Sequence, residues 1–131
     1  MKIKILTLCD FAADYNGRLS IIGTTDRLTS EQYPSGPVSF SIVCQFELIP
    51  STKVGMHPVS LAFYEKETGK HVMQQQELNL SVSETGAQGN NRRLLANLIV
   101  KVDSLSFPTP GVYIVKVTTE DDAGDIELYV D

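Results

Sequence analysis

The sequence predicts an all-β protein, an antiparallel β-sandwich of eight or nine strands. Hydrophobic and polar residues alternate with a period of two in several short segments, as they do in strands with one buried face. Residues that favour turns separate these segments along the whole chain, and no segment has helical periodicity. A sandwich buries the hydrophobic faces of two sheets against each other, and 131 residues suffice for one such core. We therefore predict a single domain over residues 1–131.

The first two strands are predicted at residues 3–9 and 18–24, on either side of Asn16–Gly17. The Asn-Gly dipeptide is strongly preferred where both residues of a two-residue hairpin turn need positive φ. A loop of two residues places Asp10 opposite Gly23. The sequence thus predicts an N-terminal hairpin, in which the small residues Ala12 and Ala13 leave room for a bulge or twist.

A short edge strand is expected at residues 28–33, and the clearest strand of the chain follows at residues 38–48. The inward positions of this strand are hydrophobic: Val38, Phe40, Ile42, Cys44, Phe46 and Leu48. The residues between them are mostly polar, so the opposite face should meet water or a neighbouring layer.

Three further strands are expected before residue 84. The alternation of residues 59–63 predicts one strand, and Glu67–Lys70 contains a glycine suited to a tight hairpin turn. A return strand is expected at residues 71–75. Residues 78–83 alternate again and predict another half-buried strand.

The last three strands are predicted at residues 94–102, 112–119 and 126–130. Both faces of the first are partly hydrophobic, which is typical of a central strand. Residues 107–111 interrupt the pairing, because proline donates no hydrogen bond to a neighbouring strand. The acidic segment 120–125 has the composition of a turn, so the final two strands should form a C-terminal hairpin.

Charge and hydropathy exclude several functional classes. A net charge of −5 repels phosphate backbones, so we predict no nucleic-acid partner. The apolar run at residues 5–9 is shorter than a secretion signal needs, and no stretch approaches the roughly 20 apolar residues that span a bilayer. We therefore expect a cytoplasmic protein without membrane contact. The two cysteines, Cys9 and Cys44, match no zinc pattern and are expected to be buried thiols.

Two segments resemble known families. The segment 110–117, Pro-Gly-Val-Tyr-Ile-Val-Lys-Val, resembles the late strand of immunoglobulin-like and fibronectin-like modules. That resemblance implies an immunoglobulin-like β-sandwich in which Tyr113 packs at a corner and its hydroxyl bonds nearby backbone. The absence of tryptophan argues against a true antibody-type domain.

The N-terminal stretch is similar to the opening of a family of short uncharacterised bacterial proteins, a domain of unknown function. The similar residues are Leu8–Ala12, Asn16–Leu19 and Ile22–Asp26. The resemblance implies a bacterial, cytoplasmic, single-domain protein. It implies no activity and no catalytic residues.

The sequence contains no catalytic motif that we recognise. His57 and His71 stand outside any paired ligand pattern, so they are expected to be ordinary exposed histidines. Neither cysteine lies beside a recognisable base, no serine occupies a Gly-x-Ser-x-Gly turn, and no glycine-rich phosphate loop is present. We therefore predict a protein that is not an enzyme and has no cofactor.

The leading hypothesis is a binding or scaffold module that acts through a sheet face, an edge strand or loops. The candidate binding residues are Tyr33, Arg92, Arg93, Asp10, Asp26 and Arg27. Arg92 and Arg93 are more typical of the start of a solvated strand than of a phosphate site. The aspartates and Arg27 are more typical of turn capping and an exposed ion pair than of a binding site. Because an edge strand can accept a strand from a partner or from a second copy, we expect a protein partner or a homodimer.

Two alternatives stay open. The first is a domain that binds a small ligand or calcium, with Asp121, Asp122 and Asp125 as the calcium candidates, since calcium prefers oxygen ligands. These residues lack the Asp-x-Asp-x-Asp pattern of a dedicated loop, so our prediction is no metal site. A hydrolase with an unrecognised site belongs to the same class. The second alternative is a structural subunit of a larger assembly.

Overall fold

The computed structural model describes residues 1–49, 52–82 and 94–131 as nine β-strands and the segments that join them. The strands are β1 (Lys2–Tyr15), β2 (Arg18–Thr25), β3 (Arg27–Leu28), β4 (Val38–Leu48), β5 (Gly55–Glu65), β6 (Gln76–Val82), β7 (Leu94–Leu105), β8 (Gly111–Thr118) and β9 (Ala123–Val130). In this part of the chain no helix is long and apolar enough to cross a membrane.

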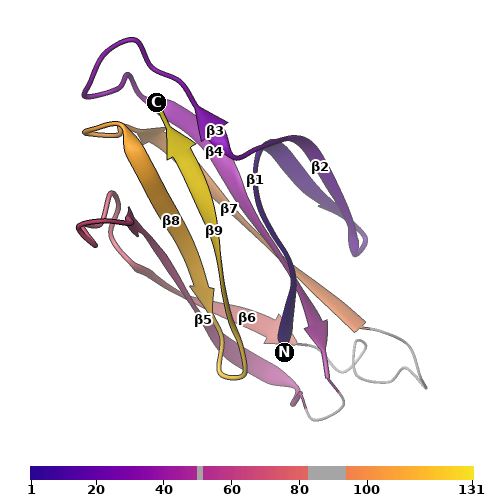
Figure 1. The fold of residues 1–131 in the computed structure, drawn as a ribbon. Helices are drawn as coiled ribbons and strands as arrows, with labels where there is room; N and C mark the ends of the chain where they lie inside the picture. Colours follow the sequence, from indigo (N-terminus) through magenta and orange to yellow (C-terminus); the bar gives the residue numbers. More distant parts are fainter. Residues whose placement is uncertain (50–51, 83–93) are drawn as a thin grey trace.

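The strands form two sheets that face each other (Figure 1). One sheet has four strands in the order β2-β1-β4-β7, and the other has five in the order β3-β9-β8-β5-β6. All neighbours are antiparallel except β3 and β9, which run parallel. The predicted β-sandwich is therefore confirmed.

The hydrophobic core lies between the sheets and takes alternate residues from both. The inward residues predicted for β4 lie in this core or pack against it, and Phe40 and Phe46 are buried. The opposite sheet contributes Phe63 and Tyr113, and Phe107 precedes β8. The ring centroids of Phe107 and Tyr113 are 4.9 Å apart, and those of Phe63 and Phe107 are 5.9 Å apart. These tilted and edge-to-face contacts add to the stabilisation that burial provides.

The fold is immunoglobulin-like in two respects. Strands β9, β8 and β5 are neighbours in that order in their sheet. In immunoglobulin domains strands G, F and C are neighbours in the same way. In addition, the Tyr113 side chain is buried and its hydroxyl donates a hydrogen bond of 2.7 Å to the Thr109 carbonyl, four residues upstream. This is the tyrosine corner that the sequence resemblance implied.

The outer face of β4 is buried as well, which two sheets alone would not achieve. Ser41, Val43 and Gln45 point away from the core, yet none is more than 7% exposed. The β1–β2 hairpin folds over this face (Figure 1). Near the hairpin end, Asp14 accepts a hydrogen bond of 3.2 Å from the Nδ2 atom of Asn97 on β7. The part of the hairpin beyond Cys9, where β1 no longer pairs with β4, therefore forms a partial third layer over the outer face of β4 and β7.

Three strand predictions were wrong. The strand expected to be central because both its faces are partly hydrophobic is β7, which lies at an edge of the four-stranded sheet and meets the β1–β2 hairpin on its outer face through Asn97. The return strand expected at residues 71–75 is reduced to a single bridge between Tyr64 and His71. Val72 and Met73 are consecutive, yet both pack against the core, and a pleated strand turns consecutive side chains to opposite faces. The edge strand expected at residues 28–33 is shorter and begins earlier, as β3, because the chain leaves the sheet to cover one end of the core.

Candidate functional site

The β1–β2 hairpin carries three of the seven large hydrophobic side chains that are exposed in the described residues. Its turn is the predicted one: Asn16 and Gly17 have φ values of 54° and 84°, which suit a two-residue hairpin loop. The Asp14 Oδ1 atom accepts a hydrogen bond of 2.7 Å from the Gly17 amide and caps the turn. Tyr15 pairs with Arg18, which fixes the register of the whole hairpin.

The hairpin changes direction at Asp10 and Gly23, which lie opposite each other as the sequence predicted. Gly23 has a φ of 72°, a conformation that favours glycine. A Cβ atom at this position would collide with the Asp10 carboxylate and would lie 3.2 Å from the Asp10 Cβ atom. Glycine is therefore required here for two reasons, its backbone conformation and the space that Asp10 occupies.

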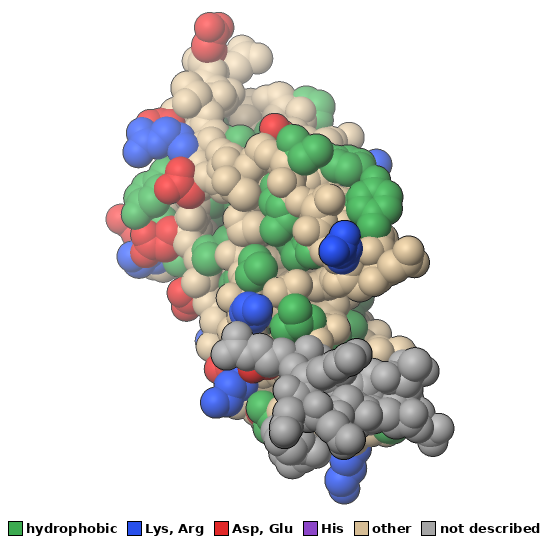
Figure 2. Space-filling model, turned by 90° about the vertical axis from the view of Figure 1, so that its right-hand side faces the viewer, with side chains coloured by type: hydrophobic (Ala, Val, Ile, Leu, Met, Phe, Trp, Pro, Cys, Tyr) green, Lys and Arg blue, Asp and Glu red, His purple; other side chains and the backbone are tan. Residues whose placement is uncertain are grey.

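Beyond this bend the hairpin exposes large hydrophobic side chains on its outward side. Phe11 pairs with Ile22, and the strand alternation places Tyr15 on the same side. Their exposures are 51%, 62% and 60%, so these side chains are mostly in contact with solvent. We call these three residues the hairpin surface. Figure 2 views the molecule from this side and shows hydrophobic side chains at the surface, with most acidic side chains along the left border.

Strand β2 forms one edge of its sheet, and its edge is unusually unprotected. Arg18, at the start of β2, is its only charged residue, and the strand contains no proline. The opposite edge, β7, carries Lys101 and Asp103, and the edge strand β6 of the other sheet carries Glu77. Charges and prolines are the usual devices that stop an edge strand from pairing with another chain.

Three charged side chains flank this edge without a partner in the described residues. Arg18 lies at the turn end of β2, whereas Asp10 and Asp26 lie at the opposite end. All three are exposed, and their side chains make no hydrogen bond or ion pair with any residue of the described ranges. These charges are therefore available to another molecule.

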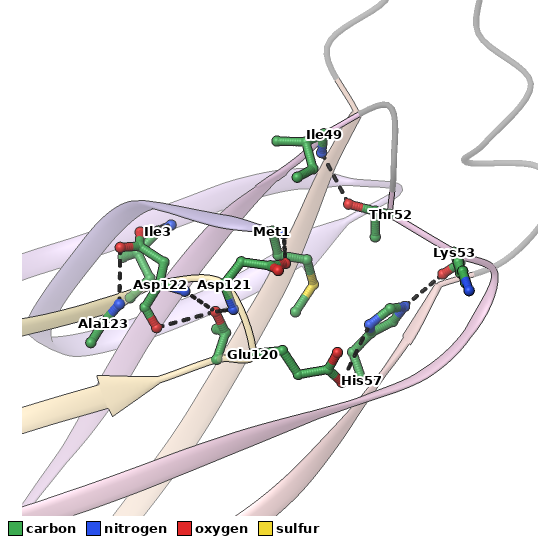
Figure 3. Close-up of polar contacts among 11 residues, drawn as sticks. Met1, Ile3, Ile49, Thr52, Lys53, His57, Glu120, Asp121, Asp122 and Ala123 are labelled. Atoms are coloured by element: carbon green, nitrogen blue, oxygen red, sulfur yellow. Dashed lines mark hydrogen bonds and ion pairs between the residues drawn. The ribbon is translucent and has the colours of Figure 1, made fainter.

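The acidic turn holds the start of β1 in place instead of gathering oxygens around one point (Figure 3). The Asp121 carboxylate accepts a hydrogen bond from the Met1 amine. The Asp122 carboxylate accepts hydrogen bonds of 2.9 Å from the amides of Ile3 and Ala123, and these bonds hold the Asp122 pKa below its usual range. Asp125 lies on β9, opposite Lys116.

The structure gives no support to the calcium alternative at this turn. No group of three or more His, Cys, Asp or Glu side chains that could hold a metal ion occurs within residues 1–49, 52–82 and 94–131. His57 lies beside Glu120, with 3.9 Å between Nδ1 and Oε1, and its Nε2 atom is 2.6 Å from the Lys53 carbonyl (Figure 3). These contacts link His57 to the turn before β9 and to the segment before β5, and they do not form a group of metal ligands.

The other candidate residues from the sequence are scattered. Tyr33 packs against the core, and its buried hydroxyl has no hydrogen-bond partner among the described residues. Arg27 makes an exposed ion pair of 3.1 Å with Asp131 and lies over the Tyr129 ring, so its partner is not one of the aspartates with which the sequence grouped it. Arg92 and Arg93 lie outside the described residues.

A cleft of about 280 Å³ lies between the loop before β4 and the loop before β8. Its lining is Leu28, Thr29, Ser30, Ser35, Gly36, Pro37, Val38, Phe107 and Val130. The Ser35 hydroxyl already accepts a hydrogen bond from the Phe107 amide and donates one to the Gly36 carbonyl. The side chain best placed to bind a polar ligand is therefore already engaged within the fold.

Sequence reasoning placed Asp10 correctly but missed the hairpin surface. The two-residue loop already fixed the pairing of Phe11 with Ile22, and both are large hydrophobic residues. The missing information was the bend at Gly23, because without it these side chains would be expected over the sheet instead of in solvent.

The fold and the hairpin define the class of protein: an all-β, immunoglobulin-like sandwich with an exposed hydrophobic hairpin and, in its described residues, no cluster typical of a metal centre. The chain belongs to DUF6941, a family of unknown function, whose model matches residues 4–131. A comparison with curated proteins found no match.

Proposed function

We propose that this protein is a non-enzymatic binding module that takes up a protein partner at the β1–β2 hairpin. The observation that carries the proposal is the combination of Phe11, Tyr15 and Ile22 in solvent beside an edge strand without protecting charges. Exposed apolar side chains that cluster are typical of interaction surfaces, and aromatic residues are enriched in them. A free edge adds main-chain hydrogen bonds to such a surface.

The setting we propose is the cytoplasm of a bacterium. The resemblance of the N-terminal stretch to short bacterial proteins supports the source. The two cysteines support a reducing compartment, since both are buried and free as thiols in the fold. A calcium-binding role has less support, because the carboxylates of Asp121 and Asp122 are engaged by the start of β1.

Site-specific photo-crosslinking in living cells tests the proposal. A photoreactive amino acid replaces Tyr15 in one variant and Ser60, on the outward side of the five-stranded sheet, in a matched control. We expect a discrete protein adduct from position 15 and none from position 60. Introducing Phe11→Ser and Ile22→Ser together should abolish the adduct. Equal adducts at both positions, or none at position 15, would overturn the proposal.

A further inference from the structure

The free edge of β2 presents a defined set of backbone groups. In a hairpin with a two-residue loop the closing pair, here Tyr15 and Arg18, is hydrogen-bonded, and the pairs then alternate. Leu19 and Ile21, which precede the bend at Gly23, therefore direct their amide and carbonyl groups away from β1. An added strand would bind these two residues.

The charges beside this edge favour one direction of pairing. Arg18 stands at one end of β2, and Asp10 and Asp26 stand at the other, all exposed and without an ion pair in the described part of the chain. Two copies of β2 that ran parallel would place like charges together. Two antiparallel copies bring Arg18 of each to the acidic end of the other, where opposite charges attract.

From this distribution we infer that the occupant of the edge is a second copy of the chain, joined by antiparallel pairing of the two β2 strands about a two-fold axis. The inference rests on the proposed function and names its partner. With Ile21 on the axis, Arg18 of each copy lies toward the end of the other copy's β2 that Asp26 follows. This register is isologous, so each copy contributes the same residues.

The same register unites the hydrophobic surfaces. Ile22 of one copy lies opposite Ser20 of the other, and both are on the outward side of the hairpin. Phe11, paired with Ile22 within each copy, extends the apolar surface on either side of the axis. The uncharged centre of β2 matters as well, because each copy carries a net charge of −5 and a charged edge would add local repulsion.

Sedimentation equilibrium of the purified chain and of charge variants tests the inference. We expect a dimer for the wild type and about tenfold weaker dimerisation for Arg18→Glu and for Asp26→Arg, since each variant opposes like charges twice. An equimolar mixture of the two variants should regain wild-type affinity, because both cross-strand pairs are then opposite in sign. A structural defect in either variant would not be repaired by mixing.

A second pair of variants tests the backbone contacts. Ile21→Pro removes the amide that faces the second copy and should give a monomer, whereas Ile21→Thr keeps this amide and should remain dimeric. Circular dichroism verifies that both variants fold.

A monomeric wild type, or a mixture that stays as weak as its components, would overturn the inference. The proposed function stands if position 15 still crosslinks to a different protein, so the two failures are distinguishable.

Discussion

Gly23 shows how one residue sets the direction of a whole hairpin. Its φ of 72° is costly for any residue with a side chain, and Asp10 fills the space where a side chain would go. Gly17 has a similar φ of 84° but no atom within 4 Å of its would-be Cβ. A side chain at Gly17 would therefore meet only backbone strain, whereas one at Gly23 would meet backbone strain and a clash with Asp10.

Replacing each of these glycines by alanine should give different losses of stability. Gly17→Ala is expected to lower the free energy of unfolding by about 1 to 3 kcal/mol through backbone strain alone. Gly23→Ala should lose more, because the Asp10 side chain must also move. Urea denaturation measures both changes. In an Asp10→Ala background, the stability losses of Gly17→Ala and Gly23→Ala should become more similar. Equal losses of the two variants in the wild-type background would contradict this account.

Asp122 makes stability depend on pH in a defined direction. Hydrogen bonds from Ile3 and Ala123 hold its pKa below the usual range, so the carboxylate stabilises the native state above the unfolded pKa of about 3.9. That contribution disappears as the pH falls through the lower native pKa. Asp122→Asn should therefore be less stable than the wild type at pH 7, with a gap that closes toward pH 3 in urea denaturation.

Asp125→Asn is the matched control for this measurement. Asp125 is exposed on β9 near the same turn, and its side chain makes no hydrogen bond with a described residue. Its replacement should cost less stability at pH 7 than Asp122→Asn does, because no backbone amide loses its acceptor. An equal response of the two variants would show that general charge, and not the anchoring of β1, sets the effect.

Among the elements, β8 has the most closely determined position. Tyr113 begins its buried face, and the hydroxyl of this residue bonds the Thr109 carbonyl. Tyr113→Phe should lower the free energy of unfolding by about 1 kcal/mol, because the partly buried hydrogen bond from the Tyr113 hydroxyl to the Thr109 carbonyl is lost. Thermal or urea denaturation measures the change. Tyr129→Phe, which loses an exposed hydrogen bond to Glu127, should have no measurable effect, and a similar loss in both would contradict the corner's role.

The sequence predicted those strands for which the alternation of hydrophobic residues and the flanking turn residues indicate the same bounds. Residues 38–48 alternate without a break, and the bounds of β4 match the prediction. The return strand at residues 71–75 failed because Val72 and Met73 both found space against the core, which depends on the opposing sheet and has no local signal. The hairpin surface was missed for a related reason. Its exposure depends on the bend at Gly23, and residue patterns report which side chains alternate but not which layer covers them.

At the scale of the whole molecule, the hairpin converts the outer face of one sheet into an interior. Val43 is completely buried on that face, as is Cys9, whose thiol lies 3.4 Å from the Phe11 carbonyl just past the bend. Cys44 lies on the opposite face, in the core between the sheets. Exposure of the Cys9 thiol therefore requires the hairpin to move, and exposure of the Cys44 thiol requires the two sheets to separate.

Thiol labelling should distinguish these layers in the native protein. Burial raises the pKa of both thiols, that of Cys44 to about 12, so neither should react while it is covered. Cys9 can be uncovered when the hairpin lifts, whereas Cys44 needs the two sheets to separate, and such a local opening costs less free energy than global unfolding. Alkylation at pH 8 followed by peptide mass spectrometry should show Cys9 modified faster than Cys44 in the same sample. The difference should vanish in denaturing urea. Equal native rates would mean that the hairpin and the core open together, and that the third layer is as stable as the sandwich it covers.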